Sequence, residues 1–150
     1  MAQTHVSLLV HVVFSTKNRV DLISPEIEEE LFAYIGGIVG KNESKLMAGN
    51  GTPNHVHLFL SMGKSVTLPV LVGDVKRGSS AWIKTKGGML TKFQWQDGYS
   101  AFSVGYTQSE DVIRYIANQK EHHRQRLFED EMRSFYKKYA IAYDERYLWD

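Results

Sequence analysis

The 150-residue sequence contains no cysteine, only three prolines and no long run of apolar residues. Without cysteine there are no disulfides and no thiolate metal ligands, so any bound metal must be held by histidine, carboxylate or amide groups. A membrane-spanning helix needs about 18 or more consecutive apolar residues, and the sequence has no such stretch. The first residues also lack the basic segment and apolar stretch of a secretory signal, so we expect no membrane association and a cytoplasmic location.

Net charge is also close to zero, with a formal value of +1 and a sequence pI near 8.0. Its distribution is uneven, because residues 64–92 carry six bases and one acid, whereas residues 24–43 carry five glutamates and one lysine. A concentrated basic region is a candidate phosphate-binding surface, although a solvated helix face explains the same pattern equally well. The candidate DNA contacts are Lys76, Arg77, Lys84 and Lys86, together with Arg126 from a later segment.

Apolar periodicity divides the chain into strands and helices of one domain, residues 1–150, and a content of 43% hydrophobic residues is sufficient for a core. The order is strand, helix, strand, strand, helix, strand, helix, which is the split βαβ arrangement of ferredoxin-like α+β folds with an added C-terminal helix. In that topology the first and third strands are central neighbours, so His11 should lie beside the third strand. The predicted strands are 5–15, 44–49, 55–62 and 99–106, and the predicted helices are 24–41, 66–84 and 109–126.

Two histidines, His55 and His57, stand two residues apart in the third predicted strand. Because successive strand side chains point to opposite faces, both imidazoles share one face while Val56 and Leu58 lie on the other. Two imidazoles on one rigid face can bind a divalent metal together. A half-buried strand with two water-facing histidines gives the same pattern more often, so a metal site needs a second signal.

The second signal is the helix predicted over residues 109–126, which begins with a serine cap and has acids in its first turn. At about 100° per residue, Ile113 and Leu127 belong to its buried stripe, whereas Tyr115 and Gln119 lie one turn apart on the far side. We therefore expect the tyrosine face to be free to meet a second subunit. Most helical tyrosines are core residues with a satisfied hydroxyl, but the neighbouring amide weakens that interpretation for Tyr115.

A tyrosine hydroxyl, with an ordinary pKa of about 10, is a weak nucleophile that needs an activated and well-placed electrophile. A metal on the two histidines would supply both, because neutral imidazole and amide ligands leave its full charge for a phosphate oxygen. This combination suits cleavage of a phosphodiester by tyrosine, which leaves a phosphotyrosine and a free hydroxyl. The covalent bond then keeps the energy that is needed to rejoin the strand.

Ordered segments along nearly the whole chain resemble the single-tyrosine HUH transposases of the smallest bacterial insertion sequences. The resemblance implies a ferredoxin-like homodimer that cuts and rejoins single-stranded DNA at hairpin-bearing element ends with Mg²⁺ or Mn²⁺. It implies that His55, His57 and Gln119 are metal ligands and that Tyr115 is the catalytic nucleophile. The family also tends to place the histidines of one subunit beside the tyrosine of the other, and the sequence leaves open whether the active sites of this chain form within or between subunits. The segments are HVVFSTK at 11–17, PNHVHL at 53–58, WQDGYSAFSV at 95–104, YIANQ at 115–119 and YDERYLW at 143–149.

Alternatives remain open from the sequence alone. One is a related single-tyrosine nickase, such as a replication initiator or a domesticated transposase that acts on chromosomal repeats. Another is a non-catalytic module that binds single strands through aromatic residues on the sheet face, where this chain instead has its two histidines. A hydrolytic zinc enzyme is disfavoured, because no carboxylate stands near the histidine pair as an evident base. The aromatic tail, residues 143–150, is expected to dock on the body of the protein.

Overall fold

Alternating apolar residues build a four-stranded antiparallel sheet in the computed structural model, which describes residues 2–150. The strands are β1 (Leu9–Ser15), β2 (Lys45–Thr52), β3 (His55–Ser61) and β4 (Ser100–Val104). Their order across the sheet is β2-β3-β1-β4, so the predicted central pair of β1 and β3 is confirmed, as is the ferredoxin-like α+β fold. β1 begins later than predicted, since residues 2–8 are exposed and form no strand.

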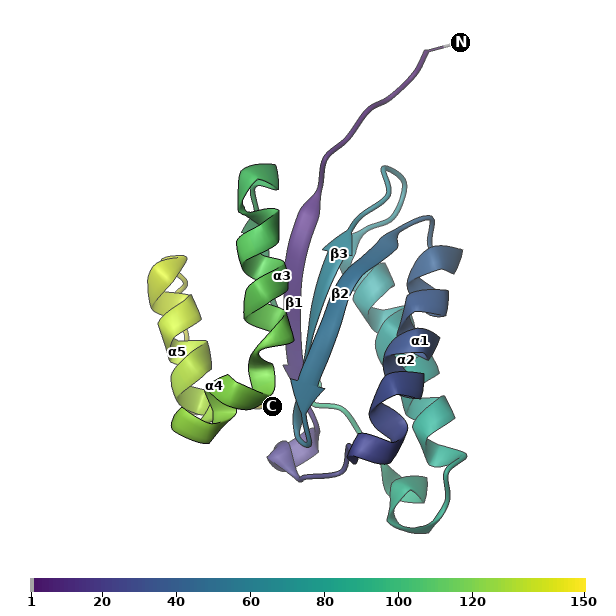
Figure 1. The fold of residues 1–150 in the computed structure, drawn as a ribbon, viewed down its shortest axis with the longest axis vertical. Helices are drawn as coiled ribbons and strands as arrows, with labels where there is room; N and C mark the ends of the chain where they lie inside the picture. Colours follow the sequence, from purple (N-terminus) through teal and green to yellow (C-terminus); the bar gives the residue numbers. More distant parts are fainter. Residues whose placement is uncertain (1) are drawn as a thin grey trace.

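Helices cover both faces of this sheet (Figure 1). Two helices from the first part of the chain lie on one face, and three from the C-terminal part lie on the other. Short 3₁₀ turns occur at Lys17–Arg19, Gly88–Lys92 and Tyr106–Gln108. The helices are α1 (Pro25–Lys41), α2 (Leu68–Lys84), α3 (Ser109–Ala117), α4 (Gln119–Gln125) and α5 (Phe128–Lys138).

The first two helices begin and pack as their sequences favour. Both have proline in the first turn, where a missing N–H removes no helical hydrogen bond. The Thr67 side chain caps α2 by accepting a hydrogen bond from Val70 N. α2 continues past Gly78, where a Cβ would lie only 2.6 Å from Ile38 Cδ1. The glycine therefore permits close packing of α1 against α2 without ending the helix.

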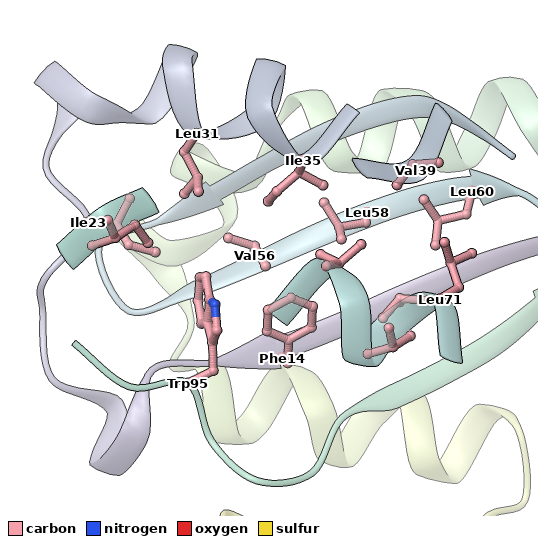
Figure 2. Close-up of a cluster of buried hydrophobic side chains, with 14 of the residues drawn as sticks. Phe14, Ile23, Leu31, Ile35, Val39, Val56, Leu58, Leu60, Leu71 and Trp95 are labelled. Carbon is pink, nitrogen blue, oxygen red and sulfur yellow. The ribbon is translucent and has the colours of Figure 1, made fainter. Parts of the chain in front are cut away.

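The main core lies between the sheet and these two helices (Figure 2). Phe14 and Leu58 from the central strands are buried there with Ile35 of α1. Trp95 packs edge-on against Phe14 at 4.8 Å between ring centroids and donates its indole N–H to Ser79 Oγ at 3.0 Å. Each large apolar side chain buried in this way contributes about 1.5–3 kcal/mol. This layer is the rigid support for the opposite face of the sheet.

The predicted continuous helix over residues 109–126 is wrong, because the chain bends at Asn118. Asn118 has φ −97° and ψ 18°, and it separates α3 from α4. A single projection at 100° per residue therefore fails beyond Asn118, and Leu127 of the predicted buried stripe is 68% exposed. Within α3 the predicted stripe is also wrong, because Ile113 is 36% exposed. Tyr115 instead packs against the buried cluster under α3.

The C-terminal tail docks on the body of the protein, which confirms the prediction. Gly98 N donates a hydrogen bond to the Asp150 carbonyl at 3.0 Å. The Trp149 ring lies 5.8 Å from the Phe128 ring and is covered by the Arg19 guanidinium at 5.4 Å. Within residues 2–150, no helix combines the length and the apolar character that crossing a membrane requires.

Candidate active site on the covered face of the sheet

The two histidines of β3 lie on the sheet face that the C-terminal helices cover, because the Nε2 atoms of His55 and His57 lie 3.6 Å and 3.2 Å from Glu131 Oε1 of α5. Their shared face is confirmed, but both side chains are fully buried, so the interpretation as a water-facing pair is wrong. The His55 ring lies 4.4 Å from the Phe128 ring at the start of α5 and 4.3 Å from the His123 ring of α4. The bend at Asn118 returns the chain over β3, and this return seals the histidines from solvent.

Hydrogen bonds at the Nδ1 atoms orient both imidazoles. His55 Nδ1 lies 2.8 Å from Asn54 Oδ1 and from Thr52 Oγ1, and His57 Nδ1 lies 2.8 Å from His11 Nε2. His11 of β1 is therefore beside the pair, as predicted. Burial and the neighbouring His57 lower the pKa of His11 to about 3, so its ring is neutral at neutral pH. Since the Nδ1 atoms are engaged, the Nε2 atoms of the pair remain for other partners.

A buried carboxylate, Glu131 of α5, lies between the histidines and the tyrosine. Its Oε1 lies 3.2 Å from Nε2 of both His57 and His123. Its Oε2 accepts a short hydrogen bond from the Tyr115 hydroxyl and a 3.3 Å bond from Gln119 Nε2. Burial raises the pKa of Glu131, but the hydrogen bonds from His123, His57 and Tyr115 outweigh burial and hold the pKa well below its usual range. The carboxylate is therefore ionised and shared by four groups.

Tyr115 points into this cluster, so the expectation of a free tyrosine face is wrong. α3 is held against β2, because Asn50 Nδ2 donates to the Ile116 carbonyl at 2.9 Å. The Tyr115 ring also stacks on His122, with 4.6 Å between centroids. Burial, followed by the nearby charge of Glu131, raises the pKa of Tyr115 well above its ordinary value of 10.0. The hydroxyl therefore keeps its proton in this arrangement.

The donor groups of the cluster fit one divalent metal ion. One ligand atom from each of His55, His57, His123 and Glu131 lies within 4.8 Å of the others. Three buried atoms, His55 Nε2, Gln119 Oε1 and His122 Nε2, have no hydrogen-bond partner among the residues that the structure describes. Buried polar atoms are rarely left unpaired, and both atom types are metal ligands. Imidazole, amide and carboxylate groups suit divalent ions from Mg²⁺ to Zn²⁺.

Two residues of this cluster, His123 and Glu131, were missed by sequence reasoning. A signal for Glu131 was present, because Phe128, Met132 and Phe135 form the apolar stripe of α5 and the glutamate falls within it. An acid inside an apolar stripe is costly unless it is paired, so its position marks a buried partner. Glu131 lies beside the histidine pair, so the prediction that no carboxylate stands there is wrong.

The predicted DNA contacts fall into two groups. Arg126 lies at the site, because it lines a pocket together with Tyr115. The others belong to α2 and the turn after it, on the opposite face of the sheet (Figure 1). There, Lys76 Nζ donates to the carbonyl oxygens of Asp97 and Gly98, and burial lowers its pKa to about 8. DNA contact by this second group, Lys76, Arg77, Lys84 and Lys86, stays a prediction.

Paired histidines on a central strand lie beside a tyrosine on the helix that covers them. Comparison with known proteins then identifies the family. Residues 4–119 match the family model of IS200-like transposases, and the chain belongs to this family. The match ends at residue 119, so the C-terminal segment that carries Glu131 lies outside it. A search of curated proteins finds no significant match.

Two solved structures share the fold. One, from Deinococcus radiodurans R1 and provisionally assigned as a transposase, is 22% identical, with a TM-score of 0.61 over 79% of this chain and 96% of that chain. The other is a REP-associated tyrosine transposase bound to a REP hairpin. It is 12% identical, with a TM-score of 0.61 over 82% of this chain and 73% of that chain. At these identities the likeness concerns the fold.

Proposed function

We propose that this transposase cleaves and rejoins single-stranded DNA by transesterification, through a covalent phosphotyrosine at Tyr115. One observation carries the proposal. The Tyr115 hydroxyl and His57 Nε2 contact the two oxygens of a single buried carboxylate, Glu131. A nucleophile and a candidate metal ligand this close can act on the same phosphate group.

We also propose that His55, His57 and Gln119 hold Mg²⁺ or Mn²⁺. When bound, such an ion would neutralise charge on the phosphate and orient it for attack. The proposal is supported by the unpartnered His55 Nε2 and Gln119 Oε1 atoms. Around them, His11 and Asn54 fix the imidazole rings, and α4 and α5 exclude water from the pair.

Groups of this chain account for the movement of the phenolic proton and for the bonds to phosphorus that form and break. In cleavage, the Tyr115 oxygen bonds to phosphorus while the bond from phosphorus to the departing oxygen breaks. The phenolic proton leaves along the existing hydrogen bond to Glu131 Oε2, and Glu131 then passes this proton to the departing oxygen, which becomes a free hydroxyl. In rejoining, that hydroxyl attacks the phosphotyrosine and Tyr115 regains its proton. The phosphotyrosine preserves the bond energy, so no nucleotide cofactor is required.

The substrate that we propose is single-stranded DNA with hairpin ends, bound by a homodimer. A structural neighbour bound to a REP hairpin supports this choice of substrate. The same neighbour favours a second candidate, a domesticated enzyme that cuts at chromosomal repeats, which the genomic surroundings of the gene would distinguish. A non-catalytic module is less well supported, because α3, α4 and α5 cover the sheet face on which bases would stack.

Incubation with single-stranded oligonucleotides from the DNA that flanks the gene tests the proposal. The wild-type protein should form a covalent adduct on a denaturing gel in Mg²⁺. Tyr115→Phe should form none while still binding DNA, because only the attacking oxygen is lost. Tyr106→Phe, at a tyrosine that is 78% exposed, is the matched control and should behave as wild type. An adduct with Tyr115→Phe would show that the nucleophile is misassigned.

The same gel tests the metal ligands. His57→Ala should abolish the adduct at any practical Mg²⁺ concentration, whereas Gln119→Ala removes a weaker ligand and should recover partly in Mn²⁺, which binds nitrogen-containing sites more tightly. Full activity of His57→Ala in a chelator would exclude the metal site.

A further inference from the structure

A pocket of about 360 Å³ opens between α3 and α5 directly beside the proposed nucleophile. The two helices lie side by side on the covered face of the sheet (Figure 1). Tyr115 and Glu131 line the pocket, so it borders the oxygen that would attack phosphorus. A volume of this size lies in the range of small-ligand sites, which begins at about 300 Å³.

One wall of the pocket is aromatic. Phe135 and Tyr139 line it, and each stacks on Phe102 with 4.9 Å between ring centroids. Phe102 is itself buried in the sheet, so it anchors both rings in fixed orientations. Both rings are only half-buried and keep part of their surface at the pocket. A preorganised aromatic surface of this kind suits a nucleobase, because every base has a flat apolar face.

Two cations complete the lining, Arg126 and Lys138. Their charges reach the site, since the Arg126 charge opposes the rise in the Tyr115 pKa that burial and Glu131 cause, and the Lys138 charge adds to the lowering of the His11 pKa by burial and His57. The Arg126 guanidinium donates to the Ser134 hydroxyl and to a backbone carbonyl. Neither cation has a carboxylate within ion-pair distance in the described part of the chain.

Both acids of the lining are engaged elsewhere. Asp111 pairs with Arg114 on the exposed side of α3, and Glu131 is shared by four groups of the site. The pocket therefore combines a flat apolar wall with two cations that have no acidic partner, which is the chemistry of one nucleotide. A base that is stacked and paired in a duplex cannot enter such a pocket, so the ligand must be single-stranded.

We propose that this pocket holds the nucleotide next to the phosphate that Tyr115 attacks, with its base on Phe135 and Tyr139 and its phosphate on Arg126 and Lys138. The inference rests on the proposed function for the identity of the attacked phosphate. All four contacts belong to residues 126–139, outside the matched family segment. The C-terminal segment would therefore hold this nucleotide by stacking and charge, whichever base it carries.

Binding of single-stranded oligonucleotides, measured by fluorescence anisotropy in a Tyr115→Phe background, tests the phosphate contacts. Arg126→Ala and Lys138→Ala should each weaken binding about tenfold, because each loses one charge-assisted contact. Each should also lower the salt slope by about 0.7, the value for one phosphate on a single strand. The matched controls are Arg124→Ala and Lys137→Ala, exposed neighbours of the same charge, which should stay within about twofold of the parent.

Ultraviolet cross-linking of the same complex tests the aromatic wall, with cross-linked peptides identified by mass spectrometry. Cross-links should map to Phe135 or Tyr139, and Phe135→Leu, which keeps an apolar side chain, should reduce them. Cross-links confined to other segments, or equal losses in the target and control variants, would overturn the inference. Failure of the proposed function has a different signature, because cross-links would then map to the pocket while wild-type protein forms no adduct at Tyr115.

Discussion

Replacement of Glu131 by glutamine should lower the stability of the metal-free protein. The carboxylate is 1% exposed and is contacted by His57, His123, Tyr115 and Gln119. An amide of the same shape is neutral and keeps one acceptor oxygen, so two of the four contacts lose their acceptor, at about 1.5–3 kcal/mol each, and the other two become weaker neutral hydrogen bonds. Removing the buried charge avoids a desolvation cost of a few kcal/mol, so we expect the free energy of unfolding to fall by about 2 kcal/mol in all.

The direction in which folding shifts the pKa of Glu131 shows whether its contacts outweigh the cost of burying its charge. Because the fold holds that pKa well below its ordinary value of 4.5, folding favours the ionised carboxylate in spite of burial. Its contribution to stability is therefore complete above the pKa of the unfolded chain and is lost as the pH falls through the folded pKa. Wild type and Glu131→Gln should differ most above about pH 4.5, and the difference should shrink in acid.

Urea unfolding at neutral pH, in a chelator, measures the loss. At a slope of about 2 kcal/mol per molar urea, the midpoint of Glu131→Gln should fall by about 1 M. Asp130→Asn removes a charge from a neighbouring residue of α5 whose side chain is 60% exposed, and it should change stability by under about 0.5 kcal/mol. An unchanged or raised midpoint for Glu131→Gln would refute the reasoning, because the contacts would then fail to outweigh the burial of the charge.

Co-expression of His57→Ala and Tyr115→Phe chains as verified mixed dimers should not restore cleavage, because one chain holds both groups at the same Glu131. Cleavage above either parent would instead show shared sites. Acidification from neutral pH to about pH 5 should lower the free energy of unfolding by about 2 kcal/mol through His11 alone, since its folded pKa is about 3 and an unfolded histidine takes up a proton near 6.5. The urea midpoints at the two pH values measure this loss of stability. His5→Ala, at an exposed histidine, is the control. Equal midpoints at the two pH values would contradict the prediction.

The local sequence was sufficient to predict those elements whose structure depends on one short-range periodicity. The helix predicted over 24–41 appears as α1 at Pro25–Lys41, because its proline start and its apolar spacing act within a few turns. The strand period likewise places His55 and His57 on one face of β3, and the order of elements predicts β1 and β3 as the central pair. These features depend on neighbours in the chain and on a topology with few alternatives.

The site itself was only partly predictable, because its remaining groups come from segments far apart in sequence. The bend at Asn118 ended the helical projection, and the packing of α3 against β2 turned Tyr115 toward its own chain where the sequence pattern indicated a free face. Composition, strand period and the ordered motifs determined the class of fold, the histidine pair and the candidate tyrosine. Only the packing of α4 and α5 over β3 decided that His123 and Glu131 meet that pair, because a contact across 74 residues of chain, such as His57 to Glu131, leaves no periodic signal.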